Sequence, residues 1–300
     1  MLRHESTGLS LGSRDKLRAA VLSGVAGYVD AAGLLSLAAI FPAHITGELV
    51  SEAVALSSGH RNGAASHLWM LPAFVLAVAV AAAVARLERR AGRAPVPMLL
   101  ALVAGGLFVF ALSGAALRLW PGVAPVVAVA QVGACSVVAA MGFQNALMRE
   151  SLNGSAPTTF MTGNLTQLVI ELVDHAFSLG RKPGIMGDVE RSVSRARLKT
   201  ATVAVSSFLV SAGVGAVLTR SFGAISALVP SLFVGLLSVQ AFRERRAKPA
   251  AAAFPNPVVG MRRPTPIQRP LSKNARPESG TRFKAVRLAG EVKKANEESA

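Results

Sequence analysis

Long runs of apolar residues alternate along this chain with short clusters of arginine and lysine. A helix needs roughly 20 mostly apolar residues to cross the hydrocarbon core of a bilayer. Six runs are close to that length or exceed it, at residues 17–40, 67–85, 96–117, 123–148, 201–218 and 222–242. This pattern predicts an all-α, polytopic membrane protein.

Two shorter segments leave the number of crossings open. Residues 44–58 and 160–179 each combine apolar residues with two carboxylates. If both segments cross the bilayer, the chain has eight spans, and if neither crosses, it has six.

The distribution of positive charge favours six spans, because basic residues collect on the cytoplasmic side of membrane proteins. With six crossings and a cytoplasmic N-terminus, the basic clusters at 86–93 and 181–199 lie inside. The outer loops then carry only Arg61, Arg118 and Arg220. With eight crossings the cluster at 86–93 would lie outside. We therefore expect six full spans, both termini in the cytoplasm, and two short helices that are re-entrant or interfacial.

Two internal repeats, residues 17–117 and 123–242, share one pattern. Each contains a glycine, an aromatic residue, any residue, an Asp or Asn and an alanine, followed further on by a Thr-Gly pair. The matching residues are Gly27, Asp30 and Thr46-Gly47 in the first repeat, and Gly142, Asn145 and Thr162-Gly163 in the second. Three crossings per repeat would give the two halves opposite orientations in the membrane, a recurring plan of secondary transporters. Four crossings per repeat would make them parallel.

Composition agrees with a membrane protein. The chain has 300 residues, of which 52% are hydrophobic and 16% charged, and its mean hydropathy is +0.46. Soluble domains are usually about 25% charged. The only cysteine, Cys135, lies in an apolar run, which excludes disulfides and zinc clusters built on cysteine.

The two ends of the chain are polar. Residues 1–16 form a cytoplasmic segment without the pattern of a cleavable signal peptide, so the first apolar run should remain as a span. Residues 243–300 carry 14 basic and 5 acidic residues and predict a disordered tail. Such a tail favours anionic lipid headgroups as its partner over nucleic acid. The insertion at 180–195, with Gly, Pro and both charge signs, predicts a surface loop.

Asp30 is the first candidate for chemistry because it lies inside an apolar run. A carboxylate near the middle of a bilayer costs a few kcal/mol on insertion scales, so it needs a cavity, a proton or a polar partner. One hypothesis places Asp30 on a solute or proton pathway. The other gives it a structural hydrogen bond between helices, for example with Asn145 of the second repeat.

The Thr-Gly pairs at 46–47 and 162–163 also allow two interpretations. Threonine caps helix N-termini, and glycine permits a close backbone approach. The pairs are then simple caps and packing contacts. Alternatively, they aim the N-termini of two half-helices at the middle of the protein, where such termini attract anions.

Carboxylates follow both pairs. Glu48 and Asn164 occupy matching positions, and Glu48 lies one helical turn before Glu52. Like charges so placed repel unless one is protonated or both face water, which makes Glu48 a candidate protonatable site. For Glu171 and Asp174 we expect a solvated helix face.

Other motifs indicate architecture. A row of small residues, Ser207, Ser211 and Gly215, predicts close helix packing in lipid. No catalytic or phosphate-binding motif stands in a suitable context. We therefore expect no enzymatic activity, no metal and no cofactor.

The two motif regions resemble the signature regions of the YoaK-like bacterial inner-membrane proteins, a family of unknown function, over about residues 17–242. The resemblance implies a small, multi-pass inner-membrane protein that is transporter-like. Its family-type positions are Gly27, Asp30, Thr46, Gly47, Gln144, Asn145, Pro157, Thr158, Thr159, Thr162 and Gly163. Glu48 departs from the pattern, which would have Asn there.

Two functions remain open. The first is a secondary transporter or permease for a small solute, with proton coupling through Asp30 or Glu48. The second is a non-transporting scaffold, sensor or lipid-binding protein that uses the basic tail. A polar, water-accessible cavity lined by both repeats would favour the first, and close packing would favour the second.

Overall fold

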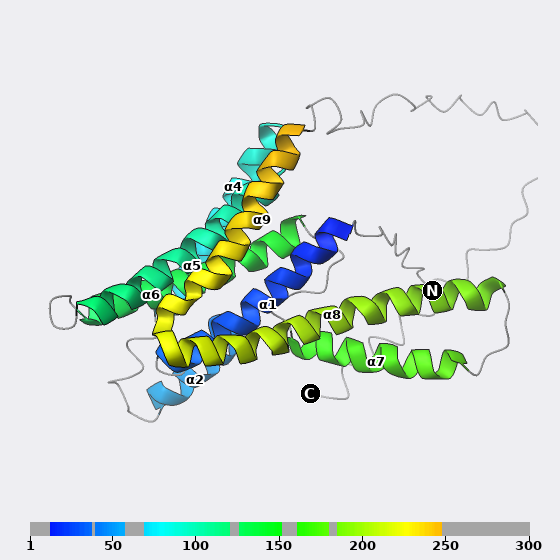
Figure 1. Ribbon diagram of the computed structural model, residues 1–300, viewed down its shortest axis with the longest axis horizontal. Coiled ribbons are helices and arrows are strands. Elements are labelled where there is room, and N and C mark those ends of the chain that lie inside the picture. The colour runs from blue at the N-terminus through cyan, green and yellow to red at the C-terminus, as the bar shows by residue number, and fades with distance from the viewer. Residues whose placement is uncertain are drawn as a thin grey trace, which may run out of the picture. The chain divides into compact units, whose positions relative to one another are not determined.

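Every regular element in the described part of the chain is a helix, which confirms the all-α expectation there (Figure 1). The computed structural model describes residues 13–37, 40–57, 69–120, 126–151, 161–179 and 185–247. The helices are α1 (Ser13–Ser36), α2 (Ile45–Ser57), α4 (Met70–Arg90), α5 (Val96–Leu119), α6 (Val126–Ser151), α7 (Met161–Leu179), α8 (Ile185–Phe222) and α9 (Leu228–Ala247), with a 3-10 turn η1 (Gly223–Ala227) before α9.

Five stretches of the described residues are long and apolar enough to cross a membrane: Arg14–Ser36, Met70–Arg90, Val96–Leu119, Val126–Ser151 and Ser192–Ala247. The first four are α1, α4, α5 and α6, as the apolar runs predict. The last stretch contains α8 from Ser192 onward, η1 and α9, and the chain turns at Gly223 with a φ of 69°. The chain is thus a membrane protein with several apolar helices.

Two boundaries differ from the sequence expectations. Residues 185–195 were expected in a loop, but they form the start of α8. The glycines and proline that suggested a loop end at Gly187, and apolar residues then recur at Val189, Val193 and Ala196, the spacing of an amphipathic helix. The disordered tail was predicted to begin at residue 243, but α9 continues to Ala247. The rest of the proposed tail, 248–300, lies outside the described residues.

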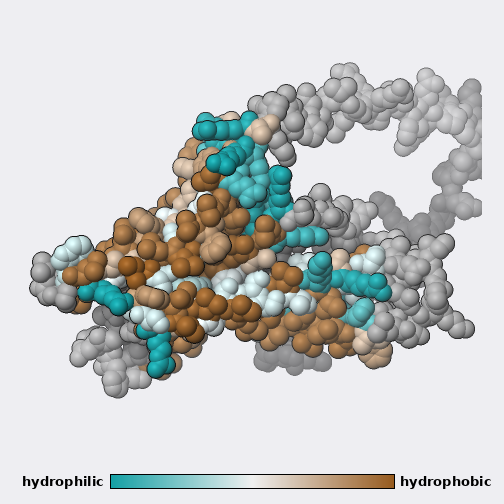
Figure 2. Space-filling model, in the orientation of Figure 1, coloured by the Kyte–Doolittle hydropathy of each residue, from teal (hydrophilic) through white to brown (hydrophobic). Residues whose placement is uncertain are grey.

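Apolar side chains cover much of the surface. On the face shown in Figure 2, hydrophobic residues gather over the middle of the helices and hydrophilic ones near helix ends. Large exposed side chains include Leu209 at 62%, Leu232 at 64% and Val127 at 72%. Soluble monomers rarely expose large contiguous apolar patches, so this surface fits contact with lipid.

Helices distant in sequence make the most extensive contacts. α1 packs along α8, and α4 packs along α6. α5 lies between α6 and α9, while α7 runs beside the first half of α8 (Figure 1). The buried core includes Leu99, Phe110 and Met141 from α5 and α6, together with Leu22 and Val29 from α1.

Small residues bring α1 and α8 into very close contact. A Cβ on Gly27 would overlap the backbone carbonyl of Phe208, with the carbonyl carbon at 2.9 Å. A Cβ on Gly24 would lie 2.7 Å from Ser211 Oγ, and one on Gly215 would lie 2.9 Å from the carbonyl oxygen of Tyr28. The predicted close packing of the row Ser207, Ser211 and Gly215 is therefore confirmed for its last two members.

A similar contact joins α4 and α6. Gly142 matches Gly27 in the sequence pattern, and a Cβ on Gly142 would lie 2.9 Å from Ala77 Cβ and 3.1 Å from the carbonyl oxygen of Phe74. Each motif glycine therefore faces the backbone carbonyl of a phenylalanine on a distant helix.

We predict that Gly27→Ala destabilises the protein. The added methyl group would force α1 and α8 apart, and overpacking of this kind costs about 1–3 kcal/mol. The melting temperature of the purified protein in detergent should fall. Gly213→Ala on α8 is the matched control, because a Cβ there meets nothing within 4 Å. Equal melting temperatures for the two variants would contradict this account of the contact.

Candidate functional site

Asp30 anchors the segment that follows α1. Its carboxylate is buried, with 5% of the residue exposed. Oδ1 accepts a hydrogen bond from the Ala43 backbone N–H at 2.8 Å, and Oδ2 lies 2.5 Å from His44 Nδ1. Both carboxylate oxygens of Asp30 therefore bind partners within the first predicted repeat. Neither is directed at Asn145, so the hydrogen bond suggested for that pair is not made.

Glu48, in the first turn of α2, holds the same segment from the other side. Its residue is 6% exposed, and Oε1 accepts a hydrogen bond from the Phe41 backbone N–H at 2.8 Å. Gly33 lets this segment lie against α1, since a Cβ there would come within 2.6 Å of the Ile40 carbonyl oxygen. Two carboxylates and one glycine therefore determine where α2 begins.

A cavity of about 380 Å³ lies where α2 and α7 begin. Thr46 comes from the first turn of α2, and Thr162 and Gly163 come from the first turn of α7. Asn145 and Arg149 of α6 lie one helical turn apart on its wall. The structure thus brings together residues from both predicted repeats, as the half-helix interpretation of the Thr-Gly pairs requires.

Other predicted residues lie outside the lining of this cavity. Gln144 is fully buried, and its Nε2 donates to the Leu22 carbonyl oxygen at 2.9 Å, which joins α6 to α1. Asn164 is 4% exposed, and Gly47 is exposed on α2. Asp30 reaches the cavity only through His44, which does line it.

Three features outside the predicted site residues complete the cavity. Arg149 contributes a cation, Phe74 and Val78 of α4 an apolar wall, and His44 an imidazole. Arg149 follows Asn145 at i+4, a spacing that places both on one helix face and could have identified it. The contribution of α4 could not be found this way, because it depends on how α4 packs against α6.

Positive charge reaches the cavity from helix N-termini and from Arg149, while the carboxylate of Asp30 lies behind His44. The first N–H groups of a helix have no intrahelical partner, and the helix dipole adds partial positive charge there. Two helices, α2 and α7, begin at this cavity, and Arg149 adds a full charge. The arrangement suits a small solute with acceptor or anionic groups.

His44 connects the cavity to the packed seam of α1 and α8. Its ring meets the ring of Phe208 edge-on, with centroids 6.2 Å apart. The hydrogen bond to Asp30 raises the pKa of His44 above its usual value of 6.5, and partial burial opposes this effect. His44 lies between α1 and α2, outside the five apolar stretches.

The expectation that Glu171 and Asp174 lie on a solvated face of α7 is correct for Asp174 and wrong for Glu171. Asp174 is exposed, but the side chain of Glu171 is only 4% exposed. Gln167 Nε2 donates to Glu171 Oε1 at 2.8 Å, and Ser194 Oγ donates to Oε2 at 3.2 Å. Glu171 faces α8, because the unexpected helical residues around Ser194 cover that side of α7.

Comparisons with known proteins identify one family. The family model described as "Protein of unknown function (DUF1275)" matches residues 18–240. No curated protein and no solved structure matches the chain. Within the described residues, no group of three or more His, Cys, Asp or Glu is placed to hold a metal ion, and family-type positions 157–159 lie outside them.

We predict that the stability of the protein depends on His44 near neutral pH. A raised pKa in the folded state means that the contribution is fully present below pH 6.5 and is lost as the pH rises through the folded-state value. The melting temperature should therefore fall as the pH rises above 6.5. His44→Gln should flatten this part of the profile, whereas His175→Gln, on α7, should keep it. An unchanged profile in His44→Gln would refute the assignment.

Proposed function

The chain belongs to the DUF1275 family, and from the geometry we propose that it is a permease that moves a small polar or anionic solute across the membrane. The observation that carries this proposal is the cavity lined by the first turns of α2 and α7 together with Asn145 and Arg149. Transporter sites commonly lie between repeats, where broken helices direct their N-termini at the solute.

Contacts between helices of the two predicted repeats support an internal symmetry. If α1, α2, α4 and α5 correspond to α6, α7, α8 and α9, then the contact of α1 with α8 is the counterpart of that of α6 with α4. Both contacts are extensive. Gly27 faces the Phe208 carbonyl in the first, and Gly142 faces the Phe74 carbonyl in the second. Under this correspondence, equivalent residues make equivalent contacts.

Ion pairs at helix ends support six crossings. Arg18 of α1 binds Glu244 of α9 at 2.7 Å, Arg245 of α9 binds Glu88 of α4 at 2.7 Å, and Arg89 of α4 binds Glu150 of α6 at 2.6 Å. The start of α1 and the ends of α4, α6 and α9 therefore lie on one side. Six crossings require this arrangement. Eight crossings would place the ends of α4 and α9 on opposite membrane faces.

Proton coupling would use the pair of His44 and Asp30. His44 lines the cavity and is bound to Asp30, so a proton exchanged at the imidazole changes the charge beside the solute. Glu48 has no such route among its described contacts, since it is bonded to the Phe41 backbone away from the cavity lining. We therefore propose the His44 imidazole, held by Asp30, as the group that exchanges the proton.

The topology can be tested with single cysteines. We expect Arg90→Cys and Arg220→Cys, made in a Cys135→Ser background, to lie on opposite sides of the membrane. Both arginines are exposed, so the substitutions should leave the packing intact. A membrane-impermeant thiol reagent applied to right-side-out vesicles should label only Arg220→Cys, and inside-out vesicles should reverse the result. Labelling of both from one side would exclude six crossings.

The solute pathway can be tested in the same background. Thr46→Cys and Thr162→Cys should react with a small aqueous thiol reagent, because both positions line the cavity. Leu209→Cys, on the lipid-facing surface, should not. If neither threonine position reacts from either side, the cavity is closed to water and a non-transporting membrane protein becomes the better description.

Transport itself can be measured in proteoliposomes that enclose a pH-sensitive dye. We expect at least one of a panel of small carboxylates, inorganic phosphate, sulfate and neutral sugars to change the internal pH faster than in protein-free liposomes. Thr162→Trp should abolish the signal by filling the cavity, whereas Leu209→Trp should preserve it. A response equal to that of empty liposomes for the entire panel would count against proton-coupled transport.

A further inference from the structure

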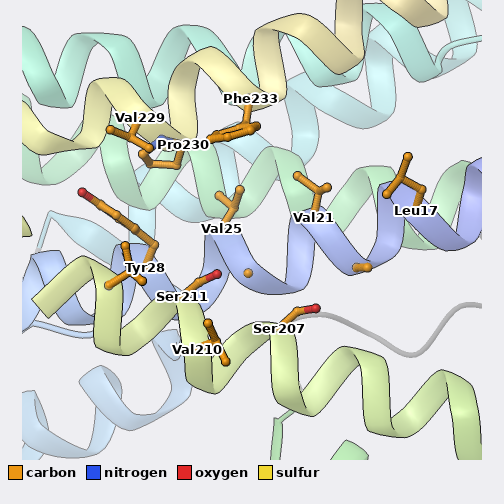
Figure 3. Close-up of a pocket in the computed structure, with 13 residues that line it drawn as sticks. Leu17, Val21, Val25, Tyr28, Ser207, Val210, Ser211, Val229, Pro230 and Phe233 are labelled. Carbon is orange, nitrogen blue, oxygen red and sulfur yellow. The ribbon is translucent and has the colours of Figure 1, made fainter.

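A second opening, more apolar than the cavity, borders α1. It is a groove of about 460 Å³ between α1, α8 and α9 (Figure 3). Leu17, Val21, Val25 and Tyr28 form one face of α1 along it, and Pro230 and Phe233 of α9 lie opposite. From Leu17 to Tyr28 the groove extends for about 16 Å at the usual helical rise.

The groove has two different ends. At its inner end Tyr28 is buried, and its hydroxyl donates to the Ser226 carbonyl oxygen in η1 at 2.9 Å. At the other end Leu17 is 55% exposed. The only hydroxyls drawn on the α8 wall belong to Ser207 and Ser211 (Figure 3). The groove is therefore an apolar slot. A hydrogen bond closes it at the Tyr28 end, and it is open at the Leu17 end.

Exposed basic residues of α1 and α9 lie near the open end. Lys16 and Arg14 lie beside Leu17 on α1, and Arg243 lies on the last turns of α9, which Arg18 joins to α1 through Glu244. The side chain of Arg14 is 68% exposed although it contacts Glu244 at 3.2 Å. Six basic and two acidic residues occupy positions 14–18 and 243–246 together. An apolar slot with a cationic mouth is complementary to a lipid with an anionic headgroup.

The matching contact in the other half of the molecule is closed by side chains. There α5 packs tightly on α6: a Cβ on Gly106 would lie 2.9 Å from Ala140 Cβ, and one on Gly133 would overlap Ser113 Oγ. The contact of α1 with α9 is much less extensive than that of α5 with α6. α5 and α6 are thus in direct contact, whereas a groove remains between α1 and α9.

We propose that this groove is a binding site for an anionic phospholipid. One acyl chain lies along Leu17, Val21 and Val25, and the phosphate lies between Lys16, Arg14 and Arg243. The lipid fills a groove that has no counterpart between the closely packed α5 and α6. This inference does not depend on the transport function.

The test uses the purified full chain in detergent and native mass spectrometry, with phosphatidylglycerol and phosphatidylcholine of identical acyl chains as probes. We expect phosphatidylglycerol to be retained preferentially. Lys16→Gln should weaken its retention about fivefold, the effect of one basic residue near an anionic lipid. Arg220→Gln, at the far end of α8, is the matched control and should change nothing. Glycerol phosphate should fail to compete, because the apolar slot holds the chain.

Filling the slot tests the acyl chain separately. Val21→Trp should reduce the retention of both lipids, whereas Leu209→Trp, on the lipid-facing surface outside the groove, should not. Ser207→Leu is a milder second variant with the same expected direction, and the melting temperature of each variant establishes that it is folded. Equal retention of the two lipids by the unsubstituted protein, retention unaffected by folded groove variants, or a lipid-free dimer would each overturn the proposal.

Discussion

The close approach of α1 and α8 is the contact on which the rest of the structure depends. Gly27 presses on the Phe208 carbonyl, and Gly24 and Gly215 let the two helices meet without side chains between them. Hydrophobic burial gives little preference for helix association within lipid, so backbone proximity and packing must supply it. This seam also joins the two halves of the sequence, since α1 is the first helix described and α8 lies late in the chain.

The same seam reaches the cavity through a short series of contacts. Phe208 contributes its carbonyl to the Gly27 contact and its ring to His44. His44 binds Asp30 and lines the cavity where α2 and α7 begin. Under the proposed transport function, a change in protonation or solute at this cavity acts on residues in direct contact with the main helix seam. Such a connection is a physical basis for coupling a binding event to helix movement.

The proposed correspondence between the two halves is not exact in its helix packing. Gly27 and Gly142 make similar contacts at α1–α8 and α4–α6, but α1 contacts α9 much less than α5 contacts α6. The ion pairs from Arg18 to Glu244 and from Arg245 to Glu88 still hold α9 at its charged end. We expect an acyl chain in the groove that remains between α1, α8 and α9.

Much of this architecture was predictable from local sequence, because apolar run length alone decides which segments can cross a bilayer. Runs 17–40, 67–85, 96–117 and 123–148 each correspond to one helix, and the Thr-Gly pairs do begin short helices. The roles of the carboxylates were not predictable. Glu171 is buried because α8 begins earlier than expected, and Asp30 and Glu48 are bound by backbone amides of a segment that folds back on α1. Periodicity reports which face of a helix is apolar, whereas the partner of a polar side chain depends on contacts between distant segments, which only the tertiary structure determines.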